Sequence, residues 1–561
     1  MLFKEKLMHL MKKDLPTKRK VFLSIVVGFT FSFTFLFFGM TDIYINNSLN
    51  LPIQFFDVMI AALVVFFPVW IGISGILILL PGRFFTVAAS LIAGVFIAGY
   101  LQGNMLNNLV YLGRLTGDPV PWHHFTRHTV INTIIWMILI FLPLVVRYFT
   151  SVAIWMKSVV IACILVTGMQ GAALVSSYIT NFDMHRSAPE YYLSREGAFE
   201  VSSDRNIMVF VIDRLDYIFI DAVRESDPTF FDRLDGFTDF NNAVSIYEAS
   251  FPSATFMTTG IAYDYIKSRV EYFDYAWDNS AFIPVLQNAG YIMNYHISDG
   301  FVYSSYNQLE GIADNLVDGS TETKLVSIVR NLTRLSAYRF SPMALKPYLW
   351  RPVVVFDVTL DISEFVSEND PLFMRLLTEN GLTIQSEGNK YYFLHLVGAH
   401  TPFIMDENSV HVGSSDLVSQ LKGSFNILYH YMDEMKRLGV YEDATIIITG
   451  DHGWGSNNMG FFVKPRGSAD TPLVSNNAPV SHANLLATIL KSEGFEYSQF
   501  GVSVFDVEQD TDGERFVVRY CETGGEVMFY KIIGDARNLD NMILLESLEF
   551  YVDFMTGLPV N

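Results

Sequence analysis

The chain is poor in cysteine, with only Cys163 and Cys521 among its 561 residues. Cys163 falls inside an apolar stretch and Cys521 in the polar second half, so we expect no disulfide between them. This scarcity excludes a disulfide scaffold and a zinc site built from clustered cysteines, and it suits a bacterial surface protein that needs no disulfides. The sequence also has no internal repeat and no low-complexity tract.

Positive charge is scarce overall, with 38 Lys and Arg against 58 Asp and Glu, which gives a net charge of −20. The deficit is uneven. Residues 1–180 contain 12 basic and 5 acidic side chains, a net charge of +7, so the remainder of the chain has −27. A basic first part joined to an acidic second part argues against nucleic acid as a partner.

Long apolar runs are abundant, since hydrophobic residues make up 51% of the chain and aromatic residues 15%. A chain of this length exceeds one hydrophobic core, so we expect at least two domains. Five apolar stretches are long enough to span a bilayer as helices. They are Val21–Ile45, Phe56–Leu80, Phe85–Leu101, Val130–Val146 and Val152–Tyr178.

The distribution of Lys and Arg predicts the orientation of these helices. The segment Lys4–Lys20 has seven basic residues and no signal-cleavage motif, so we expect a cytoplasmic N-terminus. Five crossings then place everything after Tyr178 outside. The sequence therefore predicts a multi-pass protein of the bacterial cell membrane with an extracellular second half.

The second half alternates short apolar runs with helical patterns. The runs are Asn206–Ile212, Tyr291–His296, Tyr391–Val397 and Ala444–Thr449, and the helical stretches are Ser414–Arg437 and His482–Glu493. This alternation predicts an α/β domain with a mostly parallel central sheet, in which ligands bind at the carboxyl ends of the strands. A hairpin at Phe516–Tyr520 and Val527–Tyr530, followed by a strand near Glu549–Phe554, predicts a small terminal subdomain.

The expected organisation has five parts. A basic cytoplasmic segment is followed by a transmembrane domain of five helices, a linker, the catalytic α/β domain and a C-terminal subdomain. Their predicted limits are residues 1–20, 21–178, 179–205, 206–500 and 501–561.

Two segments at predicted strand ends offer metal ligands. Asp213 directly follows the first α/β strand and provides a hard carboxylate oxygen, although an aspartate there also serves as a helix cap. Asp451 and His452 follow the strand Ala444–Thr449 and combine oxygen and nitrogen ligands. The alternative for this pair is a loop in which both side chains only hydrogen-bond the turn.

Two further positions offer catalytic groups. Ser250 precedes a Pro-containing turn and a helix that begins near Ser253, so its hydroxyl should lie where backbone N–H groups favour a phosphoryl group. Its alternative is a plain helix-capping serine. His400, beyond Tyr391–Val397, can protonate a leaving group or hold phosphate, whereas His395 lies inside that strand and is expected to be a packed core histidine.

The order of these motifs resembles the sulfatase/alkaline phosphatase superfamily. The shared layout is an aspartate after a strand, a Ser, Thr or Cys before x-Pro-Ser about forty residues later, and a late Asp-His-Gly. The segment from Pro472 to Leu490 resembles the family's late region, and the similarity covers roughly 206–493. With five preceding spans the chain resembles the lipoteichoic acid synthase and lipid phosphoethanolamine transferase branch, which implies a sulfatase-like catalytic domain.

Departures from the family pattern favour that membrane branch. Sulfatases have a second aspartate where this chain has Arg214 and an arginine where it has Ala254, which disfavours sulfate ester hydrolysis. His400 and His482 supply only part of a second metal site, so one metal is favoured. The branch uses Glu where this chain has Asp213 and Thr where it has Ser250, and both exchanges retain a ligating oxygen.

The resemblance implies a metal-dependent phosphotransferase. One divalent cation, Mn²⁺ or Mg²⁺, would bind Asp213, Asp451, His452 and the oxygen of Ser250. Ser250 would take a phosphoglycerol-type headgroup from a membrane phospholipid and pass it to a cell-surface polysaccharide or teichoic-type polymer, with His400 moving a proton. Expected substrate-binding residues are His296, Arg351, Lys464 and His482.

Two other functions fit the same motifs. One is a membrane-anchored phosphodiesterase or sulfatase that hydrolyses surface esters. The other is an inactive sulfatase-like domain that binds glycans or partners. The presence of all four residues of the expected metal set argues against the inactive domain.

Overall fold

The computed structural model describes most of the chain. The described residues are 15–47, 53–110, 120, 122–180, 191–265, 267, 269–297, 306–318, 325–350, 369–455, 457–521, 526–549, 552–553 and 558–559. The chain divides into two compact units. Unit 1 comprises residues 1–188 and 321–360, and unit 2 comprises 189–320 and 361–561.

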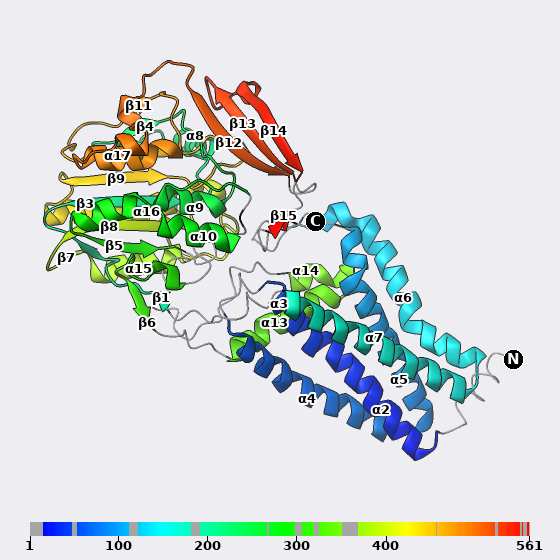
Figure 1. The fold of residues 1–561 in the computed structure, drawn as a ribbon. Coiled ribbons are helices and arrows are strands. Elements are labelled where there is room, and N and C mark those ends of the chain that lie inside the picture. The colour runs from blue at the N-terminus through cyan, green and yellow to red at the C-terminus, as the bar shows by residue number, and fades with distance from the viewer. Residues whose placement is uncertain are drawn as a thin grey trace. The chain divides into compact units, whose positions relative to one another are not determined.

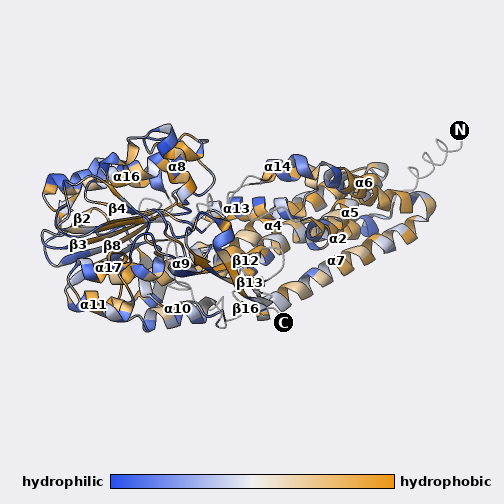
Figure 2. Ribbon diagram, turned by 90° about the horizontal axis from the view of Figure 1, so that it is seen from above, coloured by the Kyte–Doolittle hydropathy of each residue, from blue (hydrophilic) through white to orange (hydrophobic). Residues whose placement is uncertain are grey.

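Unit 1 contains five helices that are long and apolar enough to cross a membrane, as the sequence predicts (Figure 2). The first span is built from α2, the π-helical segment η1 and α3. These elements and the other four spans are α2 (Thr17–Ser32), η1 (Phe33–Phe38), α3 (Gly39–Ile45), α4 (Phe55–Leu79), α5 (Gly82–Asn104), α6 (Thr126–Phe149) and α7 (Val152–Thr180).

The third and fourth spans are longer than their apolar runs. α5 continues past Leu101 to Asn104, and the fourth span begins with the 3₁₀ turn η4 (Trp122–Phe125). The polar end of α5 has partners in the bundle, since Gln102 Oε1 accepts from Asn132 Nδ2 at 2.7 Å and from Trp136 Nε1 at 2.9 Å. Because paired polar residues extend a helix beyond its apolar run, the run alone underestimates its length.

A helix from the second half of the sequence belongs to unit 1. α13 (Leu325–Phe340) buries Ile328, Leu332 and Leu335 among residues of α3 and α4. The segment 321–360, which falls within the range expected for the catalytic domain, therefore groups with the membrane helices. The other elements of this segment are η8 (Met343–Leu345) and α14 (Lys346–Leu349). Unit 1 also contains η3 (Leu106–Leu109), which follows α5.

Unit 2 is built around a seven-stranded sheet, in the order β11-β4-β10-β9-β3-β8-β5 (Figure 1). Only β10 runs antiparallel to its neighbours; the β11–β4, β9–β3, β3–β8 and β8–β5 pairs are parallel, which confirms the predicted fold class. The strands are β3 (Asn206–Ile212), β4 (Thr238–Phe240), β5 (Tyr291–His296), β8 (Asn389–Leu396), β9 (Ala444–Thr449), β10 (Phe461–Lys464) and β11 (Val474–Asn476).

Helices cover both faces of this sheet because its central strands are apolar on both sides. All seven residues of β3 are buried, and alternate residues such as Phe210 and Val211 enter different core clusters. One face packs against α8 (Tyr217–Ser226), α15 (Asp370–Asn380) and α16 (Leu417–Leu438). The other packs against α9 (Ser250–Thr259), α11 (Phe282–Asn288) and α17 (Leu485–Ser492).

The C-terminal residues form a three-stranded antiparallel sheet of β12 (Glu514–Cys521), β13 (Glu526–Ile533) and β14 (Met542–Glu549). The predicted hairpin is present, but the third strand precedes the expected position near Glu549–Phe554. Val518 N–H of β12 donates to Ile246 O at 2.7 Å, so the small sheet supports the segment that leads to Ser250.

Smaller elements complete unit 2. They are β1 (Tyr191–Leu193) with β6 (Leu316–Asp318), β2 (Glu200–Val201) with β7 (Thr383–Ile384), β15 (Val552–Asp553) with β16 (Leu558–Pro559), α10 (Arg269–Asp278), and the short turns η6 (Phe230–Arg233), η7 (Tyr306–Leu309), η10 (His482–Asn484), η11 (Ser498–Phe500), η12 (Val504–Asp506) and η13 (Leu539–Asn541).

Candidate metal centre

Asp213 lies directly beyond the carboxyl end of β3, where the backbone of the next strand holds it. Its N–H donates to Leu396 O at 3.2 Å, and Ala399 N–H donates to Asp213 O at 2.9 Å. Gly398 has φ +62°, and a Cβ there would meet Asp213 N at 2.6 Å. Only glycine fits this close approach, so the loop after β8 fixes the backbone of Asp213.

Asp451 lies beyond the end of β9, which is adjacent to β3, and its side chain is fully buried. Its Oδ1 accepts the backbone N–H groups of Arg214 at 3.0 Å and His452 at 2.8 Å. Burial alone would raise the pKa of Asp451, but the neighbouring His452 and hydrogen bonds from His395 and Ser250 hold it below its usual range. Asp451 is therefore an anion in this site.

His452 points its Nε2 atom at the two carboxylates. This atom lies 3.4 Å from Asp213 Oδ1 and 3.9 Å from Asp451 Oδ2. Its Nδ1–H donates to Gly453 O at 2.9 Å, because a carbonyl can only accept. This hydrogen bond selects the neutral tautomer that has its lone pair on Nε2, the form that a metal ligand requires.

Ser250 opens α9 and its side chain hydrogen-bonds Asp451, so the serine joins the group formed by Asp213, Asp451 and His452. Phe251, with φ −91° and ψ 126°, interrupts the helix just after the serine, as the predicted start near Ser253 requires. Ser250 is only 7% exposed. The four residues of the expected metal set, far apart in the sequence, thus meet at one edge of the sheet.

The donor set fits a divalent cation. Ligand atoms of Asp213, Asp451 and His452 all lie within 4.8 Å of one another. Asp213 Oδ1 is buried, and the only described group that pairs with it is the His452 ring at 3.4 Å, so the oxygen has room for a further positive partner. Two carboxylates, an imidazole and a hydroxyl suit Mn²⁺ or Mg²⁺ better than soft metals.

Cation affinity is predicted to rise with pH, because His452 must lose a proton to become a ligand. Burial would lower its pKa, but Asp451 and Asp213 raise the pKa of His452 to about 9. Below that pH the proton competes with the cation, so the association constant should increase about tenfold per unit between about pH 6 and pH 8. Calorimetric titration with Mn²⁺ measures this slope. The His452→Gln variant should bind Mn²⁺ weakly, and its affinity should not depend on pH in this range. An Mn²⁺ affinity that does not change with pH in the unmodified chain would contradict the role of His452 as a metal ligand.

Two other predicted histidines lie close to the metal set. His482 is buried, and its Nε2–H donates to Gly450 O at 2.9 Å, directly before Asp451. Burial lowers the pKa of His482 to about 4, so this histidine is neutral. Its hydrogen bond to Gly450 stabilises the loop that carries Asp451. His400 is half-buried, one residue beyond Ala399, and its Nδ1–H donates to Thr401 O at 2.6 Å.

Two of the remaining predicted substrate-binding residues, Lys464 and His296, are described by the structure, and no hydrogen bond or ion pair joins either of them to Asp213, Asp451 or His452. Lys464 Nζ donates to Glu442 O at 3.2 Å and Ala444 O at 3.1 Å, at the start of β9. Because β10 runs antiparallel to β9, its last residue lies at the opposite edge of the sheet from Asp451. His296 packs beside Tyr392 at 5.1 Å, and burial lowers its pKa to about 3. Arg351 lies outside the described residues.

His395, interpreted from the sequence as a core histidine, is buried but also contacts the site. Its Nε2 lies 3.2 Å from Asp451 Oδ2, and that carboxylate raises its pKa despite the opposing effect of burial. His395 is the register partner of Val211 in β3, two residues before Asp213, and this register is visible only in the structure.

Asp370 and Arg214 also contribute without having been predicted. Asp370 accepts the N–H groups of Val397 and Gly398, each at 2.9 Å, and thereby holds the loop behind Asp213. The Arg214 guanidinium lies 3.4 Å from the centre of the Trp454 ring, so it stacks beside the metal set. Asp370 is remote in sequence, so no local pattern could have pointed to it.

Comparisons with known proteins found structural similarity only. No protein-family model matches the chain, and no curated protein matches its sequence. A protein of the alkaline phosphatase superfamily from Vibrio parahaemolyticus is 11% identical over 66% of this chain and 85% of its own, with a TM-score of 0.37.

Two further solved structures are similar to a comparable extent. Phosphonate monoester hydrolase SpPMH from Silicibacter pomeroyi is 15% identical over 59% of this chain and 87% of its own, with a TM-score of 0.36. Lipoteichoic acid synthase LtaP from Listeria monocytogenes is 11% identical over 62% of this chain and 88% of its own, with a TM-score of 0.35.

Proposed function

We propose that the chain is a membrane-bound, metal-dependent phosphotransferase that uses Ser250 as its nucleophile. The observation that supports this proposal is the convergence of Ser250 with Asp213, Asp451 and His452 at one buried sheet edge. A serine that only caps a helix does not require two carboxylates and an imidazole around its hydroxyl. Such an environment activates a weak nucleophile.

The metal set assigns a role to each residue. Asp213, Asp451 and His452 would hold one Mn²⁺ or Mg²⁺, and that ion would favour the ionised serine and neutralise charge on a phosphoryl group. Asp451 accepts the hydrogen bond of Ser250 and so orients Oγ. His395 contacts the carboxylate of Asp451, and the carbonyl of Gly453 accepts a hydrogen bond from His452. These two contacts hold the Asp451 and His452 side chains in place.

The proposed substrate is a membrane phospholipid with a phosphoglycerol-type headgroup. Ser250 Oγ forms a bond to phosphorus while the bond from phosphorus to the diacylglycerol oxygen breaks. The serine proton ends on that oxygen, relayed by His400, and phosphoglycerol remains on the serine. The oxygen of an acceptor hydroxyl on a cell-surface glycan or teichoic-type polymer then forms a bond to the same phosphorus while the bond from phosphorus to Ser250 Oγ breaks. The proton of the acceptor hydroxyl returns to Ser250 Oγ.

The five apolar helices support the choice of a lipid donor, since they keep the chain in the plane where phospholipid is concentrated. The predicted orientation, with a cytoplasmic N-terminus and unit 2 outside, places the acceptor among surface polymers. The N-terminal basic segment supports that orientation.

The test is a search for the covalent intermediate. Purified full-length chain is incubated with Mn²⁺ and phosphatidylglycerol that has a deuterated headgroup, quenched in acid and analysed by peptide mass spectrometry. One labelled phosphoglycerol unit on the Ser250 peptide is expected. Free labelled glycerol phosphate as the sole product would indicate the hydrolase. Neither adduct nor cation binding would indicate the inactive binding domain.

A further inference from the structure

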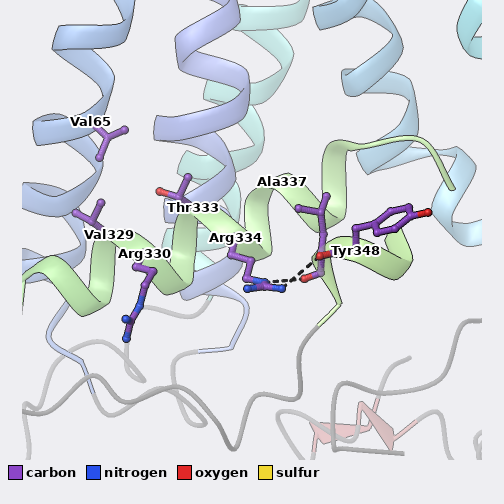
Figure 3. Close-up of a pocket in the computed structure, with 8 residues that line it drawn as sticks. Val65, Val329, Arg330, Thr333, Arg334, Ala337 and Tyr348 are labelled. Atoms are coloured by element: carbon purple, nitrogen blue, oxygen red, sulfur yellow. Dashed lines mark hydrogen bonds between the residues drawn. The ribbon is translucent and has the colours of Figure 1, made fainter. Parts of the chain in front are cut away.

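An arginine-bearing groove lies on the surface of unit 1. It has a volume of about 500 Å³ (Figure 3). Its walls come from three helices: α4 on one side, α13 along the floor, and α14 at the end. The lining residues are Val65, Val329, Arg330, Thr333, Arg334, Ala337, Tyr348 and Leu349.

The floor of the groove is rigid because α13 is anchored to the membrane helices. Ser336 Oγ donates to Phe35 O at 2.5 Å, and Arg339 forms an ion pair with the buried Asp42. Figure 3 shows α13 running crosswise to the membrane helices. An amphipathic helix in this arrangement is typical of the interface between hydrocarbon and lipid headgroups.

Two guanidinium groups on the same face of α13 give the groove positive charge. Arg330 and Arg334 are four residues apart, which places them one above the other on the helix. Arg334 is held in place, since Nε donates to Leu349 O at 2.9 Å and Nη2 to Tyr348 O at 3.3 Å. Arg330 is exposed, and within the described part of the chain no carboxylate forms an ion pair with it.

The opposite wall of the groove is apolar and continues into the lipid-facing surface of α4. Val65 lines the groove, and its exposed neighbours Val64, Phe67 and Ile71 lie on the same membrane helix. A small soluble anion would pair with the arginines but leave this wall uncovered. A neutral lipid such as diacylglycerol would cover the wall but offer no counter-ion to the exposed Arg330.

We infer that this groove binds a glycerophospholipid, with its phosphate on Arg330 and Arg334 and an acyl chain along α4 at Val65. Guanidinium groups suit this task because they donate paired hydrogen bonds to phosphate oxygens. The site belongs to the membrane unit alone. It does not rest on the proposed transfer reaction, and it holds whether or not the bound lipid is later consumed.

The inference is tested by photo-crosslinking. Full-length chain in detergent micelles is irradiated with phosphatidylglycerol that has a diazirine in one acyl chain, and the labelled peptides are mapped. Label on peptides of α4 and α13 is expected. Arg330→Gln should lower the apparent affinity for this labelling about tenfold, since a hydrogen bond to a charged group is lost. Arg334→Lys retains the positive charge but loses the paired N–H donors of the guanidinium, so it should lower the apparent affinity less than Arg330→Gln does.

Controls separate this site from general effects of charge and from catalysis. Arg127→Gln removes another exposed arginine, at the start of α6 and outside the groove, and should leave the labelling unchanged. Ser250→Ala should also leave it unchanged, so a failure of the proposed reaction would not affect the result. Unlabelled phosphatidylglycerol should compete, whereas diacylglycerol and inorganic phosphate should not.

Three outcomes would overturn the inference. One is equal loss of labelling in Arg330→Gln and Arg127→Gln. Another is label confined to other helices. The third is competition by inorganic phosphate or diacylglycerol as effective as that by the phospholipid. Because Arg330 is exposed and packs against no core residue, its replacement is not expected to unfold α13.

Discussion

Ser250→Ala is expected to lower kcat/KM for release of diacylglycerol from phosphatidylglycerol by about 10⁴-fold or more, because the covalent route disappears with its nucleophile. The variant should still fold, since alanine fits the space of a serine that is only 7% exposed at the start of α9. Turnover is measured with a fluorescent phosphatidylglycerol in mixed micelles, and folding by the thermal unfolding midpoint.

Ser253→Ala provides a matched control on the same helix. Ser253 is fully buried, and its Oγ has no hydrogen-bond partner among the described residues. This substitution should therefore change turnover by less than about threefold, within the usual scatter of conservative changes away from reacting groups. Comparable activity in the Ser250→Ala and unmodified chains would refute the proposed nucleophile.

Asp213→Asn is expected to weaken Mn²⁺ binding by about 100-fold or more. Loss of a residue that hydrogen-bonds a metal ligand lowers the metal affinity about 10–100-fold, and loss of a direct ligand should lower it at least as much. Asparagine retains the size of the side chain, so the backbone contacts to Leu396 and Ala399 should persist. Isothermal titration calorimetry of the full-length chain gives the affinity, and metal analysis after dialysis gives the stoichiometry.

The control for this change is Asp433→Asn, which removes one negative charge from the surface of unit 2. Asp433 is an exposed residue of α16 and forms an ion pair with Arg233 at 2.8 Å. Its replacement should therefore leave the Mn²⁺ affinity unchanged. Equal affinities in Asp213→Asn and the unmodified chain would remove Asp213 from the metal set, and the proposed site would have to be rebuilt around other ligands.

The central strands could be predicted from the sequence because their signal is local. β3, β5 and β9 match their predicted limits, since each is a short and mainly apolar run. The candidate metal site followed from the same reasoning, because β3 and β9 are parallel and their carboxyl ends meet at one edge. Asp213 and Asp451 come together for that reason.

Other features depend on contacts that no local pattern contains. β10 is as apolar as its neighbours, but it runs in the opposite direction, which moves Lys464 to the far edge of the sheet. α13 has the amphipathic pattern of a soluble-domain helix, yet its apolar face packs on membrane helices. A hydrophobic face shows that a helix is covered, but not by which partner.

The assignment of α13 to unit 1 means that the polypeptide passes between the two units at three places, near residues 188, 320 and 360. A shortened version expressed from residue 189 onward would include α13 without the helices that shield it. Ile328, Leu332 and Leu335 would then face water and promote self-association. A well-behaved soluble fragment should instead replace residues 321–360 with a short hydrophilic connector, which would leave the seven-stranded sheet and the candidate metal site intact.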